Sequence, residues 1–154
     1  MSLIHQKLYM GDKLAAVDMA DYLRELGDNL LDSFGILDER VQMEYQVEPL
    51  QLDVDTAIPL GLIINELLTN ALKYAFPDGR KGKIELALWR EDDALCLKVA
   101  DDGVGEAGAA TENSTSFGSS LVAMLSKKLD GTPEPIPGAG YGTVIRFRKY
   151  KFAG

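Results

Sequence analysis

The sequence predicts an α+β fold, a two-layer sandwich in which helices cover one face of a mixed β-sheet. Segments whose apolar residues recur every three or four positions, typical of amphipathic helices, are interspersed with segments whose apolar residues alternate, typical of half-buried strands. The 154 residues include no internal repeat and no long linker, and a hydrophobic content of 46% is sufficient for one core. We therefore expect one domain with, at most, a short appendage.

The predicted elements are bounded by Gly, Pro and Asp residues. In chain order they are a helix at residues 17–35, a strand at 41–47, a short strand and a long helix within 50–77, two strands within 83–91 and 94–103 that form a hairpin, a helix at 119–129, a Pro-interrupted edge segment and a final strand at 144–150. Asp18 is the expected cap of the first helix, and Asp53 or Asp55 that of the long helix. Pro59 fits the long helix only near its first turn.

Composition excludes several classes of protein. The chain has 16 Lys and Arg against 24 Asp and Glu, a formal charge of -8, which opposes binding to nucleic acid. The single cysteine, Cys96, lies in an alternating apolar run and is interpreted as a buried strand residue, so no disulfide is expected. The longest apolar run is interrupted by Glu66 and Lys73, and the N-terminus lacks the apolar core of a signal peptide. We expect a cytoplasmic location, with the full-length protein either soluble or membrane-anchored.

A polar stripe is expected on the long helix. At about 100° per residue, Glu66, Asn70 and Lys73 fall in one narrow sector, flanked by Thr69 and Tyr74. A carboxylate and a carboxamide one turn apart supply oxygen ligands suited to Mg²⁺, and Lys73 lies where it could meet phosphate. The alternative interpretation is the solvated face of an ordinary amphipathic helix.

Three further segments combine glycine with polar residues. Asp101 to Gly105, at the end of a strand, would let a backbone approach a ligand while Asp101 accepts hydrogen bonds, or would form a plain turn. Ser116 to Leu121 opens a helix, where backbone amides bind phosphate or where Ser119 or Ser120 serves only as a cap. Gly140 to Thr143 precedes the last strand and alone indicates no more than a hairpin turn. Each segment by itself is a weak indication of function.

In their order and spacing, these segments resemble a known family. NELLTNALKYAF, DDGVG, SFGSSLV and GYGT resemble the N, G1, G2 and G3 boxes of the GHKL superfamily of ATP-binding domains. More narrowly, residues 18–147 resemble the catalytic ATP-binding domain of bacterial sensor histidine kinases, in the branch whose N box reads NELLTNALKYAFP. The resemblance implies the Bergerat fold, a mixed sheet backed by three helices, with ATP held between the long helix and a flexible lid.

The resemblance also implies roles for individual residues. Asn70 would bind Mg²⁺, with Glu66 orienting or activating through a metal-bound water. Asp101 would accept the adenine amine and so select ATP over GTP. The other implied contacts are Lys73 near the phosphates, Tyr74 near the nucleotide, Gly103 and Gly105 beside the base, Gly118, Ser119, Ser120 and Leu121 at the phosphates, and Thr143 closing the adenine pocket.

Three positions depart from the family pattern. Ser116 stands where the G2 box usually has its first glycine, which puts phosphate contacts at that point in question. The lid, residues 106–115, has no basic residue, so compensation of the γ-phosphate charge falls to Mg²⁺, Lys73, Lys127 or Lys128. Asp102 stands where Asn is common and adds negative charge beside the base.

The single histidine, His5, resembles a non-phosphorylated histidine at the end of the dimerisation helix hairpin of this branch. The resemblance therefore implies that residues 1–17 are a remnant of that hairpin and its linker, and that residues 18–154 are the catalytic domain. The function implied is transfer of the ATP γ-phosphoryl group to a histidine on a separate domain of a homodimeric kinase. The downstream partner implied is a response regulator. The alternatives are another GHKL protein, such as an anti-sigma-factor serine kinase, or a degenerate interaction module that has lost nucleotide.

Overall fold

The fold is seen in a computed structural model that describes residues 16–34, 40–74, 76, 81–103, 117–136, 140 and 142–152. Several sequence-based expectations lie outside these residues, among them the hairpin remnant with His5, the end of the first helix at Gly35 and the lid at 106–115. No helix in the described part of the chain combines the length and apolar character needed to cross a membrane.

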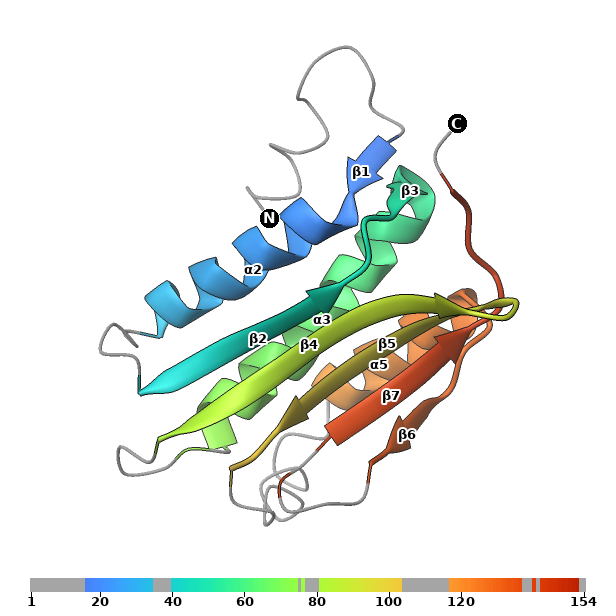
Figure 1. Ribbon diagram of the computed structural model, residues 1–154. Coiled ribbons are helices and arrows are strands. Elements are labelled where there is room, and N and C mark those ends of the chain that lie inside the picture. The colour runs from blue at the N-terminus through green and yellow to red at the C-terminus, as the bar shows by residue number, and fades with distance from the viewer. Residues whose placement is uncertain are drawn as a thin grey trace.

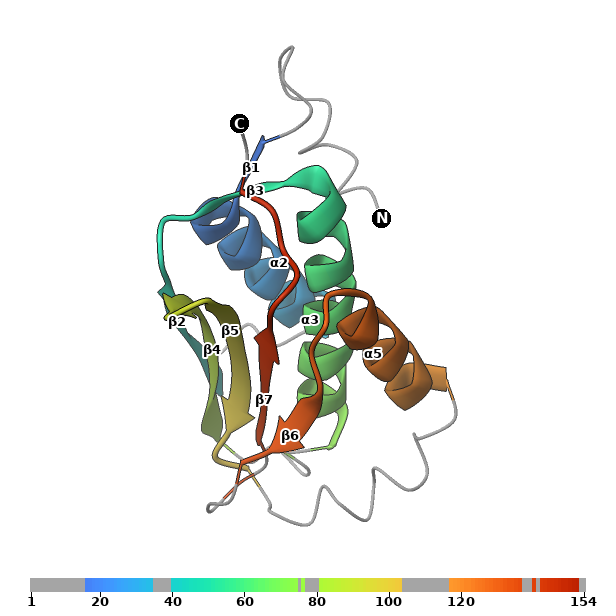
Figure 2. The ribbon, with the colours of Figure 1, turned by 90° about the vertical axis from the view of Figure 1, so that its right-hand side faces the viewer.

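A five-stranded mixed sheet forms one layer of the molecule. Its strands, in spatial order, are β2 (Val41–Val47), β4 (Gly82–Glu91), β5 (Ala94–Asp101), β7 (Gly142–Phe147) and β6 (Pro133–Pro135). β2 runs parallel to β4, and the other neighbours are antiparallel. The helices α2 (Met19–Ser33), α3 (Val54–Tyr74) and α5 (Phe117–Lys128) all lie against one face of this sheet (Figure 2). The predicted two-layer α+β sandwich is confirmed.

The caps of α2 and α3 are aspartates. Asp18 accepts a hydrogen bond from the backbone N–H of Asp21 at 3.4 Å, as its sequence position predicts. Of the two candidates for α3, Asp53 is the cap, because its Oδ2 accepts from the N–H of Asp55 at 2.9 Å. Pro59 is the sixth residue of α3 and lies in its second turn, next to the first turn where the sequence favours proline.

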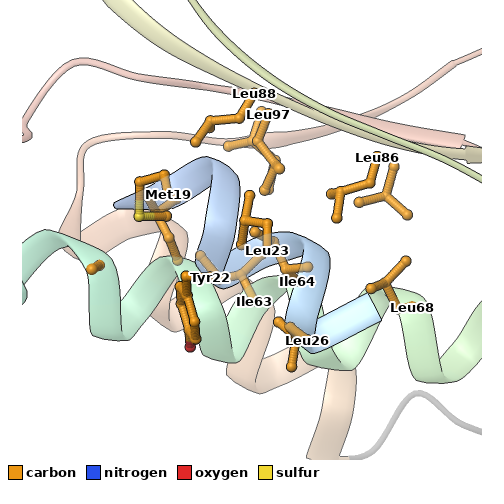
Figure 3. Packing of buried hydrophobic residues seen from close by; sticks show 14 of the residues in the cluster. Met19, Tyr22, Leu23, Leu26, Ile63, Ile64, Leu68, Leu86, Leu88 and Leu97 are labelled. Carbon is orange, nitrogen blue, oxygen red and sulfur yellow. The ribbon is translucent and has the colours of Figure 1, made fainter. Parts of the chain in front are cut away.

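The core lies between the helices and the sheet. Figure 3 shows apolar side chains of α2 and α3 packed beneath those of the central strands. The labelled members are Met19, Tyr22, Leu23 and Leu26 of α2, Ile63, Ile64 and Leu68 of α3, and Leu86, Leu88 and Leu97 of the sheet. Since Ile63, Ile64 and Leu68 are almost fully buried, the rotation of α3 about its axis is fixed by packing.

A second, two-stranded sheet lies at one end of the molecule, above the start of α3 (Figure 1). β1 (Ala16–Asp18) pairs antiparallel with β3 (Gln51–Asp53), and Phe152 bridges to Leu52 of β3. The sequence did not predict β1, whose Val17 is buried in the core.

The final strand differs from its predicted bounds of 144–150. β7 begins at Gly142 and ends at Phe147, because Arg148 and Lys149 donate their backbone N–H groups to Asp130 and Leu129. Those carbonyls lie just beyond α5, so the chain leaves β5 at this point and crosses to the end of that helix. The helix itself starts at Phe117, two residues before its predicted start.

Candidate functional site

The residues predicted to form the polar stripe on α3 differ in how exposed they are. Glu66 and Asn70 are both half-buried at the border of the packed face, and Lys73 is exposed. Within the described part of the chain, neither Glu66 nor Asn70 makes a hydrogen bond or an ion pair through its side chain. Tyr74 ends the helix, and its side chain lies outside what the structure describes.

Asn70 lies on the side of α3 that faces α5. The opposite side contacts α2, because a Cβ added at Gly61 would collide with the hydroxyl of Tyr22. Nine residues at about 100° each place Asn70 half a turn around the helix from Gly61. α5 packs along α3 on that far side (Figure 2). The two oxygen ligands predicted for Mg²⁺ therefore lie on the side of α3 that faces α5, the helix that follows the expected lid.

Asp101 and Thr143 lie on the helix-facing side of the sheet. Thr143 is paired with Val99 across β5 and β7, and Asp101 follows Val99 by two residues, so all three side chains share one face. Val99 belongs to the core, which identifies that face as the one covered by helices. Thr143 is buried and Asp101 half-buried.

The carboxylate of Asp101 is fixed by neighbouring backbone. Its Oδ1 accepts a hydrogen bond from the N–H of Gly103 at 2.9 Å, and Gly103 is itself buried. Gly140 packs closely against Asp101. A Cβ added at position 140 would collide with the Asp101 carbonyl and lie 2.9 Å from its Oδ1. Gly140 was not among the predicted site residues, although the spacing of Gly140 and Gly142 was the available signal.

The predicted residues converge on one end of the molecule. The end of α3, the end of β5 and the start of β7 lie together at the end opposite to β1 and β3 (Figures 1 and 2). Asn70, Asp101 and Thr143, which are far apart in sequence, are thus brought to the same edge of the fold.

The α5 residues are only partly defined. Gly118, Ser119 and Ser120 lie in the first turn of α5, where backbone N–H groups lack helical partners. Ser120 is exposed, and Leu121 packs against the core. Gly105 and Ser116 lie outside the described residues.

The oxygen donors on α3 fit a magnesium ion. Across the described ranges, no three His, Cys, Asp or Glu side chains gather into a metal cluster. Mg²⁺ usually keeps several waters and takes one or two protein oxygens together with substrate phosphates. The half-buried oxygens of Glu66 and Asn70 match that requirement.

A cleft of about 550 Å³ lies on the other face of the sheet, along β2, β4 and β5. Its lining includes Gln46, Glu85, Trp89 and Lys98 and none of the predicted site residues. Lys98 and Glu85 pair at 3.0 Å within it. This cleft is therefore separate from the edge that carries Asp101.

Comparison with known proteins points to the same family as the sequence motifs. The family described as histidine kinase-like ATPase domain matches residues 39–147, and a second family, described as histidine kinase, matches residues 1–34. Blue-light-activated histidine kinase 2 of Erythrobacter litoralis is 27% identical over 149 residues, 94% of this chain and 43% of that protein. Sensor histidine kinase PdtaS of Mycobacterium tuberculosis is 30% identical over 138 residues, 86% of this chain and 26% of that protein. The chain thus spans less than half the length of these two relatives.

Solved structures agree on the fold. The histidine kinase domain of an Erythrobacter litoralis blue-light activated histidine kinase superposes with a TM-score of 0.80 at 25% identity, covering 96% of this chain and 70% of that one. Full-length ShkA in complex with AMPPNP superposes with a TM-score of 0.67 at 18% identity, covering 99% of this chain and 35% of that one.

Proposed function

Because this chain belongs to the family of histidine kinase-like ATPase domains, we propose that it binds Mg²⁺-ATP at the edge formed by α3, β5 and β7. We further propose that it transfers the γ-phosphoryl group to a histidine on a separate domain. The observation that carries the proposal is the convergence of Asn70, Asp101 and Thr143 on one edge. The AMPPNP complex of ShkA, which shares the fold, supports a nucleotide as the ligand.

We propose a role for each of these residues. Asp101, held by the Gly103 amide, accepts the adenine amine, and Thr143 closes the pocket from the neighbouring strand. Asn70 supplies an oxygen ligand to Mg²⁺, and Glu66, one turn earlier, accepts hydrogen bonds from the waters around the ion. Mg²⁺ offsets the charge of the phosphates when it is bound. The remaining proposed contacts are Lys73, Tyr74, Gly105, Gly118, Ser119, Ser120 and Leu121.

The whole protein's reaction is proposed on the same basis. The chemistry of phosphoryl transfer requires alignment and charge neutralisation more than covalent participation by the protein. We propose that the acceptor histidine belongs to a dimerisation domain of which residues 1–17 are the end, that residues 18–154 are the catalytic domain, and that a response regulator receives the phosphoryl group. The proposed assembly is a homodimer, and the proposed compartment is the cytoplasm, where ATP is available.

The metal ligand is tested by calorimetric titration with a non-hydrolysable ATP analogue, with and without Mg²⁺. We expect Mg²⁺ to strengthen binding and Asn70→Ala to remove that gain, a loss of about tenfold or more in affinity. Asn65→Ala is the matched control, because it removes the same amide from a different side of the same helix. Retention of the Mg²⁺ effect in Asn70→Ala would contradict the assignment.

The base-reading residue is tested by the preference for ATP over GTP analogues. Asp101→Asn replaces an acceptor-only carboxylate by an amide that also donates to the guanine carbonyl, so we expect the preference to fall by about tenfold. Asp93→Asn, in the turn at the other end of the β4–β5 hairpin, is the control. An unchanged preference would remove Asp101 from the base site.

A further inference from the structure

The second aspartate of the Asp101-Asp102 pair has a different environment from the first. Ile84 and Asp101 form the last rung of the β4–β5 ladder, so Lys83 faces Asp102 in the next, incomplete rung. The N–H of Asp102 donates to the carbonyl of Lys83 at 3.2 Å, as it would in a continuing antiparallel ladder. The second hydrogen bond of this rung has a side-chain acceptor.

The side chain of Asp102 takes the place of a backbone carbonyl. In a regular rung, the N–H of Lys83 would donate to the main-chain oxygen of residue 102. It donates instead to Oδ1 of the Asp102 side chain, at 2.7 Å. The main-chain carbonyl of Asp102 is thereby released from the ladder, and the chain leaves the sheet at Gly103 without exposing an unpaired amide on β4.

The Asp102 side chain is exposed, and its Oδ1 lies close to Gly82. A Cβ added at Gly82 would lie 2.6 Å from Asp102 Oδ1 and would collide with the ring of Phe76. Gly82 in turn donates its N–H to the carbonyl of Arg40, whose guanidinium donates to the carbonyl of Phe76 at 3.3 Å. Gly82, at the start of β4, therefore lies close to both the Asp102 side chain and the ring of Phe76.

We propose that Asp102 is a positioning residue for Asp101, and that its contribution is an acceptor oxygen at a defined place and not a negative charge beside the base. The inference rests on the proposed nucleotide function of Asp101. Asp102 lies in the chain between Asp101 and Gly103, and its hydrogen bonds with Lys83 fix the backbone there. The N–H of Gly103 in turn holds the Asp101 carboxylate. An Asn side chain at this position would provide the same acceptor oxygen.

Two substitutions separate geometry from charge. Asp102→Asn removes the charge and keeps the oxygen in place, whereas Asp102→Glu keeps the charge and moves the oxygen by one methylene. In the 154-residue chain, we expect Asp102→Asn to match the wild type and Asp102→Glu to weaken ATP-analogue binding about tenfold. Affinity for a GTP analogue should fall less than affinity for the ATP analogue in Asp102→Glu, because guanine has a carbonyl where adenine has the amine that Asp101 would accept. Asp93→Ala, exposed at the other end of the hairpin, is the control.

Amide hydrogen exchange in the nucleotide-free protein gives an independent readout. Asp102→Ala and Asp102→Glu should speed exchange at both Lys83 and Gly103 about tenfold, and Asp102→Asn should not. If Gly103 stays protected in the Glu variant, or if Asn weakens ATP binding as much as Glu does, the proposal is overturned. If the wild type binds neither analogue, the proposed function fails, while the exchange at Gly103 still decides whether Asp102 positions Asp101.

Discussion

The hydroxyl of Tyr22 is a polar atom enclosed between α2 and α3. It is buried against Gly61, and in the described part of the molecule it has no hydrogen-bond partner. Burial raises the pKa of Tyr22 above its ordinary value of about 10. The unfolded chain therefore loses this proton at lower pH than the folded chain does. The contribution of Tyr22 to stability is therefore complete below about pH 10 and is lost as the pH rises further.

We predict that Tyr22→Phe leaves the free energy of unfolding at pH 7 unchanged or raises it by about 1 kcal/mol, because an unpaired buried hydroxyl is removed. The same substitution should reduce the loss of stability above about pH 10. Urea unfolding at pH 7 and above about pH 10 measures these two effects on the free energy of unfolding. Tyr45→Phe is the contrasting variant, since the Tyr45 hydroxyl donates to Asp28 at 2.8 Å and its loss should cost about 1 to 2 kcal/mol at pH 7. Equal destabilisation by the two variants would contradict the prediction.

For single residues, the sequence predicted chemical roles but not contacts between distant residues. Asn70 and Asp101 were predicted, because residue type and local spacing indicate their chemistry. The contact of Gly140 with Asp101 and the bond from Lys83 to Asp102 were not predicted, because each joins residues far apart in sequence. No periodicity encodes such contacts.

Among the elements, the segment after β7 connects several parts of the fold. The N–H of Lys151 donates to the hydroxyl of Thr56 in α3 at 2.9 Å, and its carbonyl accepts from the N–H of Asp53 at 2.9 Å. Phe152 packs edge-on against Tyr150 and beneath the guanidinium of Arg90. The segment thus attaches the start of α3 to the β4–β5 hairpin.

We predict that Thr56→Val lowers the free energy of unfolding by about 1 to 3 kcal/mol, because it leaves the Lys151 amide without its acceptor while keeping the side-chain shape. Thr69→Val, half-buried on the same helix and without a hydrogen bond among the described residues, should cost less than about 0.5 kcal/mol. Denaturant unfolding monitored by circular dichroism compares the two. A similar cost for both variants would show that the Thr56 bond contributes nothing.

The elements also differ in how far their sequences predict them. The alternation of β2 gave its bounds of 41–47 correctly, because one face of that strand is half-buried and the other exposed. β1 was missed because three residues hold no periodicity and its partner, β3, is more than thirty positions away. The end of β7 was placed too late, because the turn of the chain toward the end of α5 after Phe147 depends on contacts with Leu129 and Asp130 that no local pattern shows.

For the molecule as a whole, ligand binding at one edge should be visible as global stability. A ligand that binds only the folded chain contributes about 2.7 kcal/mol at a concentration of 100 Kd. We predict that the ATP analogue with Mg²⁺ raises Tm by about 5 to 10 °C at that concentration, since each kcal/mol shifts Tm by about 2 to 4 °C for a chain of this size. Differential scanning calorimetry measures the shift, with Asn70→Ala as the variant that should lose the part due to Mg²⁺. An unchanged Tm would contradict the proposed nucleotide site.

The small sheet of β1 and β3 brings Val17 and Phe152, which are far apart in sequence, close together at the end of the molecule opposite to Asp101. Leu52 pairs with Val17 on one side and with Phe152 on the other. Strands in a sheet are about 4.8 Å apart, so Val17 and Phe152 lie only about 10 Å from each other. α3 carries the fold about 30 Å from this point to the edge that holds Asp101. A tether fused before Val17 or after Phe152 therefore leaves from the same small area and leaves the Asp101 edge open, which makes either end suitable for immobilising the protein in binding measurements.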